Sequence, residues 1–276
     1  MLCIKLSGQY LYEYDPTSLA TPKGITVNAL VFDEENYDDF DANWIAYWDD
    51  YWIDDWDAEL IEHSTKYYNC HGYAWHNIEG HMSQGQLRWI NDVNEYGQPI
   101  YNVTKYYSGS QKSYTQTTTY IENLKVSYFP RDHSAITTEN TNYYISKWAW
   151  GPLVEHNKAQ CPFYENAQIK YYKIYPQISG SSSILCSGSP RSFISDINNM
   201  PLAAKSWSKS SNLSKIYQGD FVYVTIPIPG ASGNAWIKMN IVLIAFGIQS
   251  LHFHSGTGSA ECLEAVDLYH KQNKKN

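Results

Sequence analysis

The sequence predicts an α+β domain followed by an all-β domain. Three observations support this division. A short apolar run, Tyr68 to Trp75, has the pattern of a helix that begins at a cysteine, and strand-like alternation follows it. A Pro/Gly/Ser stretch, Pro176 to Ser183, then has the composition of a linker, and the pattern beyond it is of strands alone. A helix packed on an antiparallel sheet is a stable layer arrangement for the first of these regions.

These observations give four expected segments. Residues 59–175 form the α+β domain and residues 176–250 the β-sandwich. Residues 1–58, rich in acids and aromatics, pack on the α+β domain, and residues 251–276 form a C-terminal tail.

Composition excludes several classes of protein. The chain has 276 residues with 43% hydrophobic and 17% charged content, which is typical of a folded globular protein. Its net charge of -8, without a basic run before Lys271 to Lys275, excludes a nucleic-acid partner. No apolar stretch is long enough to span a bilayer, and the N-terminus lacks the pattern of a signal peptide. We expect no cofactor, because the glycines form no phosphate loop.

An aromatic series stands before the cysteine. Tryptophans recur every fourth residue, at one face of a predicted helix, with aspartates on the opposite face: Trp44, Trp48, Trp52 and Trp56, against Asp49, Asp50, Asp54 and Asp57. We expect the indole stripe to pack on the α+β domain. The alternative is an exposed platform that stacks sugars, so a carbohydrate or cell-surface contact stays open.

Asn69 is a good helix cap, and it places Cys70 in the first turn. The partial positive charge and unpaired N–H groups of a helix N-terminus favour the thiolate form of a cysteine there. His133 follows at the start of a predicted strand. A cysteine and a distant histidine that meet only in the fold are a known arrangement of nucleophile and base.

Strands are expected at several other places. In the first half of the chain they are Thr26 to Phe32, Gln86 to Ile90, Ile100 to Tyr107, Ser113 to Ile121, Leu124 to Phe129, His133 to Thr137, Tyr143 to Trp148 and Ile169 to Tyr175. In the second half they are Ser183 to Cys186, Ser192 to Ile194, Ala204 to Ser208, Phe221 to Ile226 and Ala235 to Phe246.

The motifs YNCHGYAW, DHSAI, SKW, GPLVEH and CPFY, in this order over Glu59 to Tyr164, resemble a papain-like cysteine domain of Bacteroides-type bacterial proteins. That domain is a distant relative of the NlpC-type and CHAP cell-wall amidases. The resemblance implies a helix-on-antiparallel-sheet fold and a cysteine hydrolase, an amidase or endopeptidase. It also implies amide bonds of peptidoglycan stem peptides as substrate, and a secreted or cell-envelope location.

By position in these motifs, Cys70 is the nucleophile and His133 the general base, with sulfur and ring nitrogen within about 4 Å. The candidates for the residue that orients the histidine are Ser146, Lys147 and His156. The related pattern reads Ser-Lys-Trp-Gly, whereas Ala149 and Trp150 precede the glycine here. The alternative function is a non-catalytic surface binding protein that keeps the papain-like fold.

The second domain resembles the immunoglobulin-like or PKD-like domains of secreted Bacteroides-type proteins, through the runs ISGSSSILCSG and AAKSWSKSSNL. Trp207 follows Cys186 by about twenty residues, as a buried sandwich tryptophan does. The five cysteines form no disulfide framework. Cys186 and Cys262 pair with each other or with Cys161, and the sequence leaves this open.

A zinc site is the competing interpretation of the cysteine region. Cys70, His71, His76 and His81 are ligand types that zinc prefers. Steps of five residues, however, turn side chains well over a right angle around a helix, so ligands at this spacing do not converge. The sequence therefore predicts no metal at these residues.

Overall fold

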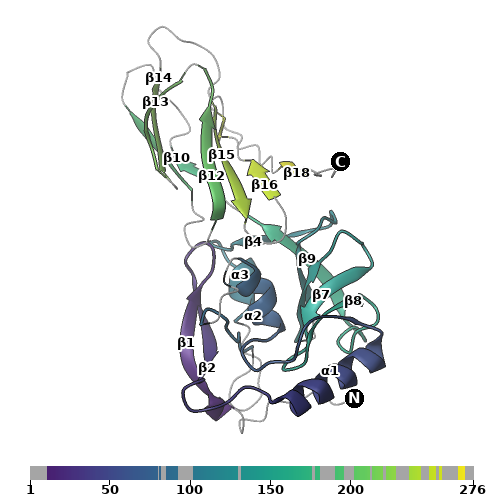
Figure 1. Ribbon diagram of the computed structural model, residues 1–276. Coiled ribbons are helices and arrows are strands. Elements are labelled where there is room, and N and C mark those ends of the chain that lie inside the picture. The colour runs from purple at the N-terminus through teal and green to yellow at the C-terminus, as the bar shows by residue number, and fades with distance from the viewer. Residues whose placement is uncertain are drawn as a thin grey trace, which may run out of the picture. The chain divides into compact units, whose positions relative to one another are not determined.

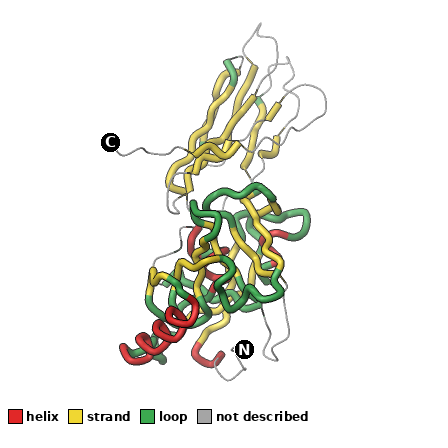
Figure 2. The backbone as a smooth tube through the Cα atoms, turned by 90° about the vertical axis from the view of Figure 1, so that its right-hand side faces the viewer, coloured by secondary structure: helices red, strands yellow, loops and turns green. Residues whose placement is uncertain are grey.

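The computed structural model describes residues 11–79, 81, 85–92, 102–129 and 132–175, and in the second half the strands of that region with a few flanking residues. The chain divides into two compact units, Met1–Thr21 with Ile25–Tyr175, and Pro176–Asn276 with Pro22–Gly24. Among the described residues strands predominate over helices in both units (Figure 2), and every strand pair is antiparallel. The architecture is thus α+β in its first unit and all-β in the described part of its second.

A seven-stranded sheet forms the frame of the first unit (Figure 1), in the order β3-β8-β7-β6-β5-β9-β4. Its strands are β3 (Glu59–Glu62), β4 (Tyr114–Thr117), β5 (Lys125–Phe129), β6 (Ser134–Thr137), β7 (Tyr143–Lys147), β8 (Leu153–Asn157) and β9 (Gln168–Ile174). Tyr128, Ala135 and Tyr144 are buried side chains of one core cluster on neighbouring strands. The predicted strands at Leu124 to Phe129, His133 to Thr137, Tyr143 to Trp148 and Ile169 to Tyr175 are confirmed at nearly these bounds.

A separate hairpin pairs β1 (Tyr14–Ala20) with β2 (Thr26–Phe32), after a single 3-10 turn η1 (Leu11–Glu13). The predicted strand Thr26 to Phe32 is confirmed. Its Leu30 exchanges backbone hydrogen bonds with Trp89, at 2.8 and 3.0 Å, and this bridge joins the hairpin to the segment after the cysteine helix.

The cysteine helix is α2 (Cys70–Trp75), followed by the 3-10 turn η2 (Asn77–Glu79). All six residues of α2 are buried, and the helix packs on β6 and β7. Gly72 is required because the backbone oxygen of Arg88 approaches it closely: an added Cβ would lie 1.8 Å from that oxygen. The glycine of the YNCHGYAW motif therefore allows the helix and the Arg88 segment to touch.

Two predicted strands are wrong. Gln86 to Ile90 contains only the isolated bridge at Trp89, and the described part of Ile100 to Tyr107 is a turn followed by the short helix α3 (Thr104–Tyr107). Of Ser113 to Ile121, only β4 is a strand. Apolar runs of this length suit either a helix or a strand, and here packing of Tyr106 and Tyr107 against Trp75 selects the helix.

The aromatic series forms helix α1 (Ala42–Trp56), but its predicted faces are partly wrong. Trp52 is buried against Trp148 at a ring distance of 5.6 Å, whereas Trp44 is 53% exposed. Asp49, expected on the outer face, is buried because its carboxylate accepts hydrogen bonds from the backbone and hydroxyl of Ser64. Trp48, Trp52 and Trp56 of the indole stripe therefore pack as predicted, whereas Trp44 does not.

The second unit contains two sheets in its described residues. One is ordered β10-β11-β14-β13, and the other β12-β15-β16-β18 with β17 paired to β15. Their bounds are β10 (Ile178–Gly180), β11 (Arg191–Ser195), β12 (Leu202–Lys209), β13 (Leu213–Gln218), β14 (Val222–Pro227), β15 (Trp236–Leu243), β16 (Gln249–His252), β17 (Ser255–Gly256) and β18 (Asp267–His270). Trp207 of one sheet stacks on Tyr223 of the other, at 5.6 Å.

The strands expected near residues 192, 204, 221 and 235 in this half are present as β11, β12, β14 and β15. The predicted strand Ser183 to Cys186 lies outside the described residues, as do Cys3, Cys186 and Cys262. Cys161 is a free cysteine, so the pairing of this residue with a later cysteine is absent.

Candidate functional site

Asn69 fixes the start of α2. Its side-chain oxygen accepts hydrogen bonds from the backbone N–H of Gly72 at 2.8 Å and of Ile90 at 3.2 Å, and its amide donates to the Ile90 carbonyl at 2.9 Å. The cap therefore holds the helix start against the Ile90 segment as well as satisfying the helix itself. Cys70 follows directly and is 6% exposed. The predicted cap and the predicted first-turn position of the cysteine are both present.

His71, the next residue, connects α2 with the start of β6. Its Nδ1 lies 2.8 Å from the hydroxyl of Ser134, and its Nε2 lies 2.7 Å from a carboxylate oxygen of Asp132. The indole N–H of Trp75 donates to the same Ser134 hydroxyl at 2.9 Å. His71 is buried, while the side chain of Asp132 is 55% exposed, so this ion pair runs from the interior to the solvent.

The charges around His71 favour its imidazolium form. Burial alone would lower the pKa of His71, but the negative charges and hydrogen bonds of Cys70 and Asp132 outweigh it and raise this pKa well above its usual value. For Asp132, burial raises the pKa, and the stronger influence of His71 lowers it below the usual range. Burial raises the pKa of the neighbouring Asp92, against the opposing charge of His71.

His133 occupies a different environment, although it is the neighbour of Asp132 in the sequence. It is 1% exposed, and its ring stacks on Phe163 at 3.9 Å and contacts the Tyr128 ring at 5.0 Å. Neither ring nitrogen has a hydrogen-bond partner. Burial, with the nearby charges of His156 and His71, lowers the pKa of His133 well below its usual value, so the ring is neutral.

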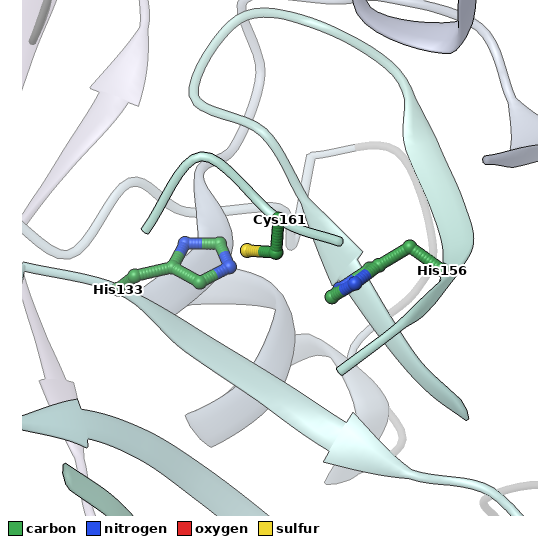
Figure 3. Close-up of side chains that lie close together, drawn as sticks. All are labelled: His133, His156 and Cys161. Carbon is green, nitrogen blue, oxygen red and sulfur yellow. The ribbon is translucent and has the colours of Figure 1, made fainter. Parts of the chain in front are cut away.

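Cys161 and His156 lie beside His133. One ligand atom of each of the three side chains lies within 4.8 Å of the others, and all three residues are buried. Cys161 stands between the two imidazole rings, with its sulfur turned toward His133 (Figure 3). Burial raises the pKa of the Cys161 thiol to about 12.

The three candidates for orienting His133 bond elsewhere. The Ser146 hydroxyl lies 2.9 Å from Nε2 of His156 and accepts a hydrogen bond from the Trp148 indole at 2.8 Å. Nδ1 of His156 lies 2.9 Å from the Asn157 carbonyl, so this nitrogen carries the proton, and burial lowers the pKa of the ring to about 4. A direct hydrogen bond between His133 and any of these groups, or with the thiol of Cys70, is absent.

Lys147, the third candidate, is fully buried with its ammonium group among backbone carbonyls. It donates to Thr65 at 3.2 Å, to Ala149 at 3.1 Å and to Gly151. Burial lowers its pKa to about 7, opposed by the charges of Asp39, Asp49 and Cys70. Ala149, at φ 56°, and Gly151 form the turn whose carbonyls surround this ammonium, so the residues inserted in the Ser-Lys-Trp pattern are accommodated by a left-handed alanine.

The described residues that lie close enough to share a metal ion form two sets, His133 with His156 and Cys161, and His71 with Asp92 and Asp132. Neither set is the zinc-ligand series considered from the sequence, which was Cys70, His71, His76 and His81. His76 and His81 stack on each other at 4.1 Å, and burial together with His81 and Arg88 lowers the pKa of His76 to about 3.

The sequence did not indicate two parts of this site. In the sequence, Cys161 is a candidate only for a disulfide, and His71 only for a metal site that the spacing disfavours. One signal in the sequence could have indicated the partners of His71. Asp132 and Ser134 are two residues apart, so on a strand they face the same side, and His133 between them faces the other side.

Comparison with known protein families, curated proteins and solved structures gives no match for this chain. Among the described residues, no helix combines the length and the apolar character needed to cross a bilayer.

Proposed function

We propose that this protein is a cysteine hydrolase that cleaves amide bonds, with Cys70 as nucleophile and His133 as general base. One observation carries the proposal: the helix that Cys70 begins packs on the strand that follows His133, and both nitrogens of this histidine are unoccupied. The neutral imidazole keeps a lone pair that no hydrogen bond occupies, while its lowered pKa makes the ring a weaker base than an exposed histidine. The order of the YNCHGYAW, DHSAI and SKW motifs supports the same assignment.

In the proposed reaction, His133 takes the proton of the Cys70 thiol, and the sulfur attacks the carbonyl carbon of the amide. His133 then gives this proton to the leaving amine as the C–N bond breaks. Water, deprotonated by the same ring, hydrolyses the thioester and restores the thiol. Because Asn69 already accepts from the Gly72 N–H, the amides of Cys70 and His71 are the candidate donors to the oxyanion.

The ion pair of His71 with Asp132 places a positive charge beside Cys70. An imidazolium next to a sulfur stabilises the thiolate, and the contacts of its two nitrogens with Ser134 and Asp132 hold the ring of His71 in place. His71 is therefore a positioning and electrostatic residue in this proposal, and His133 is the group that transfers protons. Ser146 and His156 form a hydrogen-bonded pair behind it.

We further propose a papain-like fold for the first unit, an immunoglobulin-like fold for the second, and peptidoglycan stem peptides as substrate outside the cell. The sequence resemblance supports each of these assignments. The second unit would then space or dock the enzyme on its polymeric substrate.

The test is hydrolysis of purified muropeptides by the full chain, followed by mass spectrometry. We expect cleavage by the wild type and a loss of roughly 1000-fold or more in Cys70→Ser. Cys161→Ser is the matched control, since this second buried thiol lies outside the proposed reaction, and it should retain cleavage. In parallel, iodoacetamide at pH near 6 should label Cys70 ahead of Cys161. Cleavage that survives Cys70→Ser would contradict the proposal.

A second candidate function is non-catalytic binding at the cell surface. It rests on an aromatic row on α1 in which Trp44 and Tyr47 are 53% and 54% exposed, and Tyr51 is 42% exposed. The two tyrosines stack at 6.4 Å. Exposed aromatic rings of this kind suit sugar rings. Binding of peptidoglycan that Trp44→Ala weakens, without any cleavage, would favour this candidate.

A further inference from the structure

His133, His156 and Cys161 form a cluster that protein contacts alone do not explain. A polar group buried without a hydrogen bond costs about 1–3 kcal/mol, so an orphaned group in a folded protein calls for a partner. His133 has two such nitrogens in the interior, and one of them lies within 4.8 Å of the thiol sulfur of Cys161 and of a ring nitrogen of His156. The hydroxyl of Tyr128, whose ring contacts His133, is buried beside the Cys161 thiol and interacts with it.

We infer that His133, Cys161 and the Nε2 atom of His156 form a zinc-binding site. Nitrogen and sulfur ligands in this combination are those that Zn²⁺ prefers. Tetrahedral zinc needs ligand atoms about 3.3–3.8 Å apart, so atoms that already lie within 4.8 Å of one another need only small side-chain rotations. Three protein ligands leave a fourth position for a water molecule.

The surroundings of His156 suit a metal ligand. The Asn157 carbonyl holds the proton on Nδ1, and this fixes the tautomer that presents a lone pair at Nε2. The Ser146 hydroxyl now uses that lone pair, so zinc would replace one hydrogen bond. Cys161 binds as a thiolate, and its S–H proton passes to the solvent when the Zn–S bond forms.

Zinc at this site would make the enzyme inactive. A His133 that binds a metal through its lone pair cannot take the proton of Cys70, so loading and catalysis exclude each other. This consequence rests on the proposed function, whereas zinc binding itself does not. The site would then act as a metal-controlled switch on the general base.

The experiment measures metal binding without reference to activity. The full chain is titrated with Zn²⁺ by calorimetry and with Co²⁺ by absorption spectroscopy, in buffers of different ionisation enthalpy. We expect about one Zn²⁺ per chain, release of about one proton, and a sulfur-to-cobalt charge-transfer band in the near ultraviolet. Cys161→Ser should lose the band and at least about tenfold in affinity. Cys70→Ser should keep both.

No stoichiometric binding, or a cobalt band that survives Cys161→Ser, would overturn the site. If the serine variant fails to fold, absence of the charge-transfer band from the wild type overturns it equally. Inhibition of muropeptide cleavage by Zn²⁺ that Cys161→Ser relieves would establish the switch. Zinc binding by a chain that cleaves nothing would leave the metal site in place and remove the proposed hydrolase.

Discussion

His71, in helix α2, and His133, just before strand β6, are both buried histidines, and they have opposite surroundings. Hydrogen bonds occupy both nitrogens of His71, and the neighbouring negative charges raise its pKa. His133 lies among aromatic rings with both nitrogens unbonded, and burial lowers its pKa. The comparison shows that burial by itself does not decide the charge of a histidine. The negative groups next to the ring decide it, here Cys70 and Asp132.

The same substitution at the two positions should therefore have opposite effects on stability. We expect His71→Phe to lower the free energy of unfolding by about 2–4 kcal/mol, because it removes two hydrogen bonds and leaves a buried hydroxyl with one partner fewer. Chemical denaturation of the full chain measures this. An unchanged denaturation midpoint would mean that the His71 cluster contributes no stability.

His133→Phe is the matched variant. It replaces an unbonded imidazole by a ring of similar shape that keeps the stacking on Phe163, so we expect the free energy of unfolding to rise by about 1 kcal/mol. The same variant should lose muropeptide cleavage if His133 is the proposed general base. Residues needed for catalysis often lower the stability of the fold, so activity and stability would change in opposite directions. A lower free energy of unfolding in His133→Phe would contradict this expectation. It would show that the ring nitrogens of His133 have a partner in solution, such as zinc or water.

Asp132→Asn separates charge from shape in the His71 cluster. The amide can still accept a hydrogen bond from His71, but the negative charge is gone. Because Asp132 is about half exposed, the free energy of unfolding should fall by only about 1 kcal/mol. The pKa of His71, followed by NMR titration, should move down toward its usual value. Asp54→Asn, an exposed acid of α1, is the control and should change neither quantity.

The two histidines should contribute to the pH dependence of stability with opposite signs. A raised pKa in the folded state means that His71 stabilises the fold below the ordinary histidine pKa near 6.5, and this contribution is lost as the pH rises through its folded pKa. A lowered pKa means the reverse for His133: its contribution is present above 6.5 and is lost as the pH falls. His156, whose pKa is lowered to about 4, acts in the same direction as His133.

Difference curves isolate the two histidines from the other titrating groups. The free energy of unfolding of the wild type minus that of His133→Phe should fall only on the acid side, as the pH drops below 6.5. The corresponding difference for His71→Phe should fall only on the alkaline side. Denaturation midpoints measured from pH 5 to pH 9 give both curves. Two curves of the same sign would refute the opposite surroundings of these side chains.

Several features of the fold follow from local sequence. The Asn69 cap, the cysteine in the first turn, the strand Thr26–Phe32 and strands β5, β6, β7 and β9 were all predicted from neighbouring residues. Caps and alternation act over a few residues, so the sequence carries them directly. The α+β class and the change to strands alone in the second half follow from the same periodicities.

Tertiary packing decided the rest. The run at Thr104–Tyr107 is a helix that contacts Trp75, and not the predicted strand. Asp49, predicted on the outer face of α1, is buried and accepts a hydrogen bond from Ser64. The edge strand β3 was missed because its partner β8 is far away in the chain. Strands β1 and β8 were also missed, although each pairs with a strand next to it in the chain, β2 and β7.

The site shows the same division. The sequence by itself proposed Cys70 and His133 as the reacting pair, and it placed them with His71 and Asp132 in two short motifs. It could not determine that Asp132 pairs with His71 and not with His133, or that Cys161 lies beside two imidazoles. Adjacent residues at the start of a strand point to opposite faces, and only the elements packed on each face decide their charge and their partners.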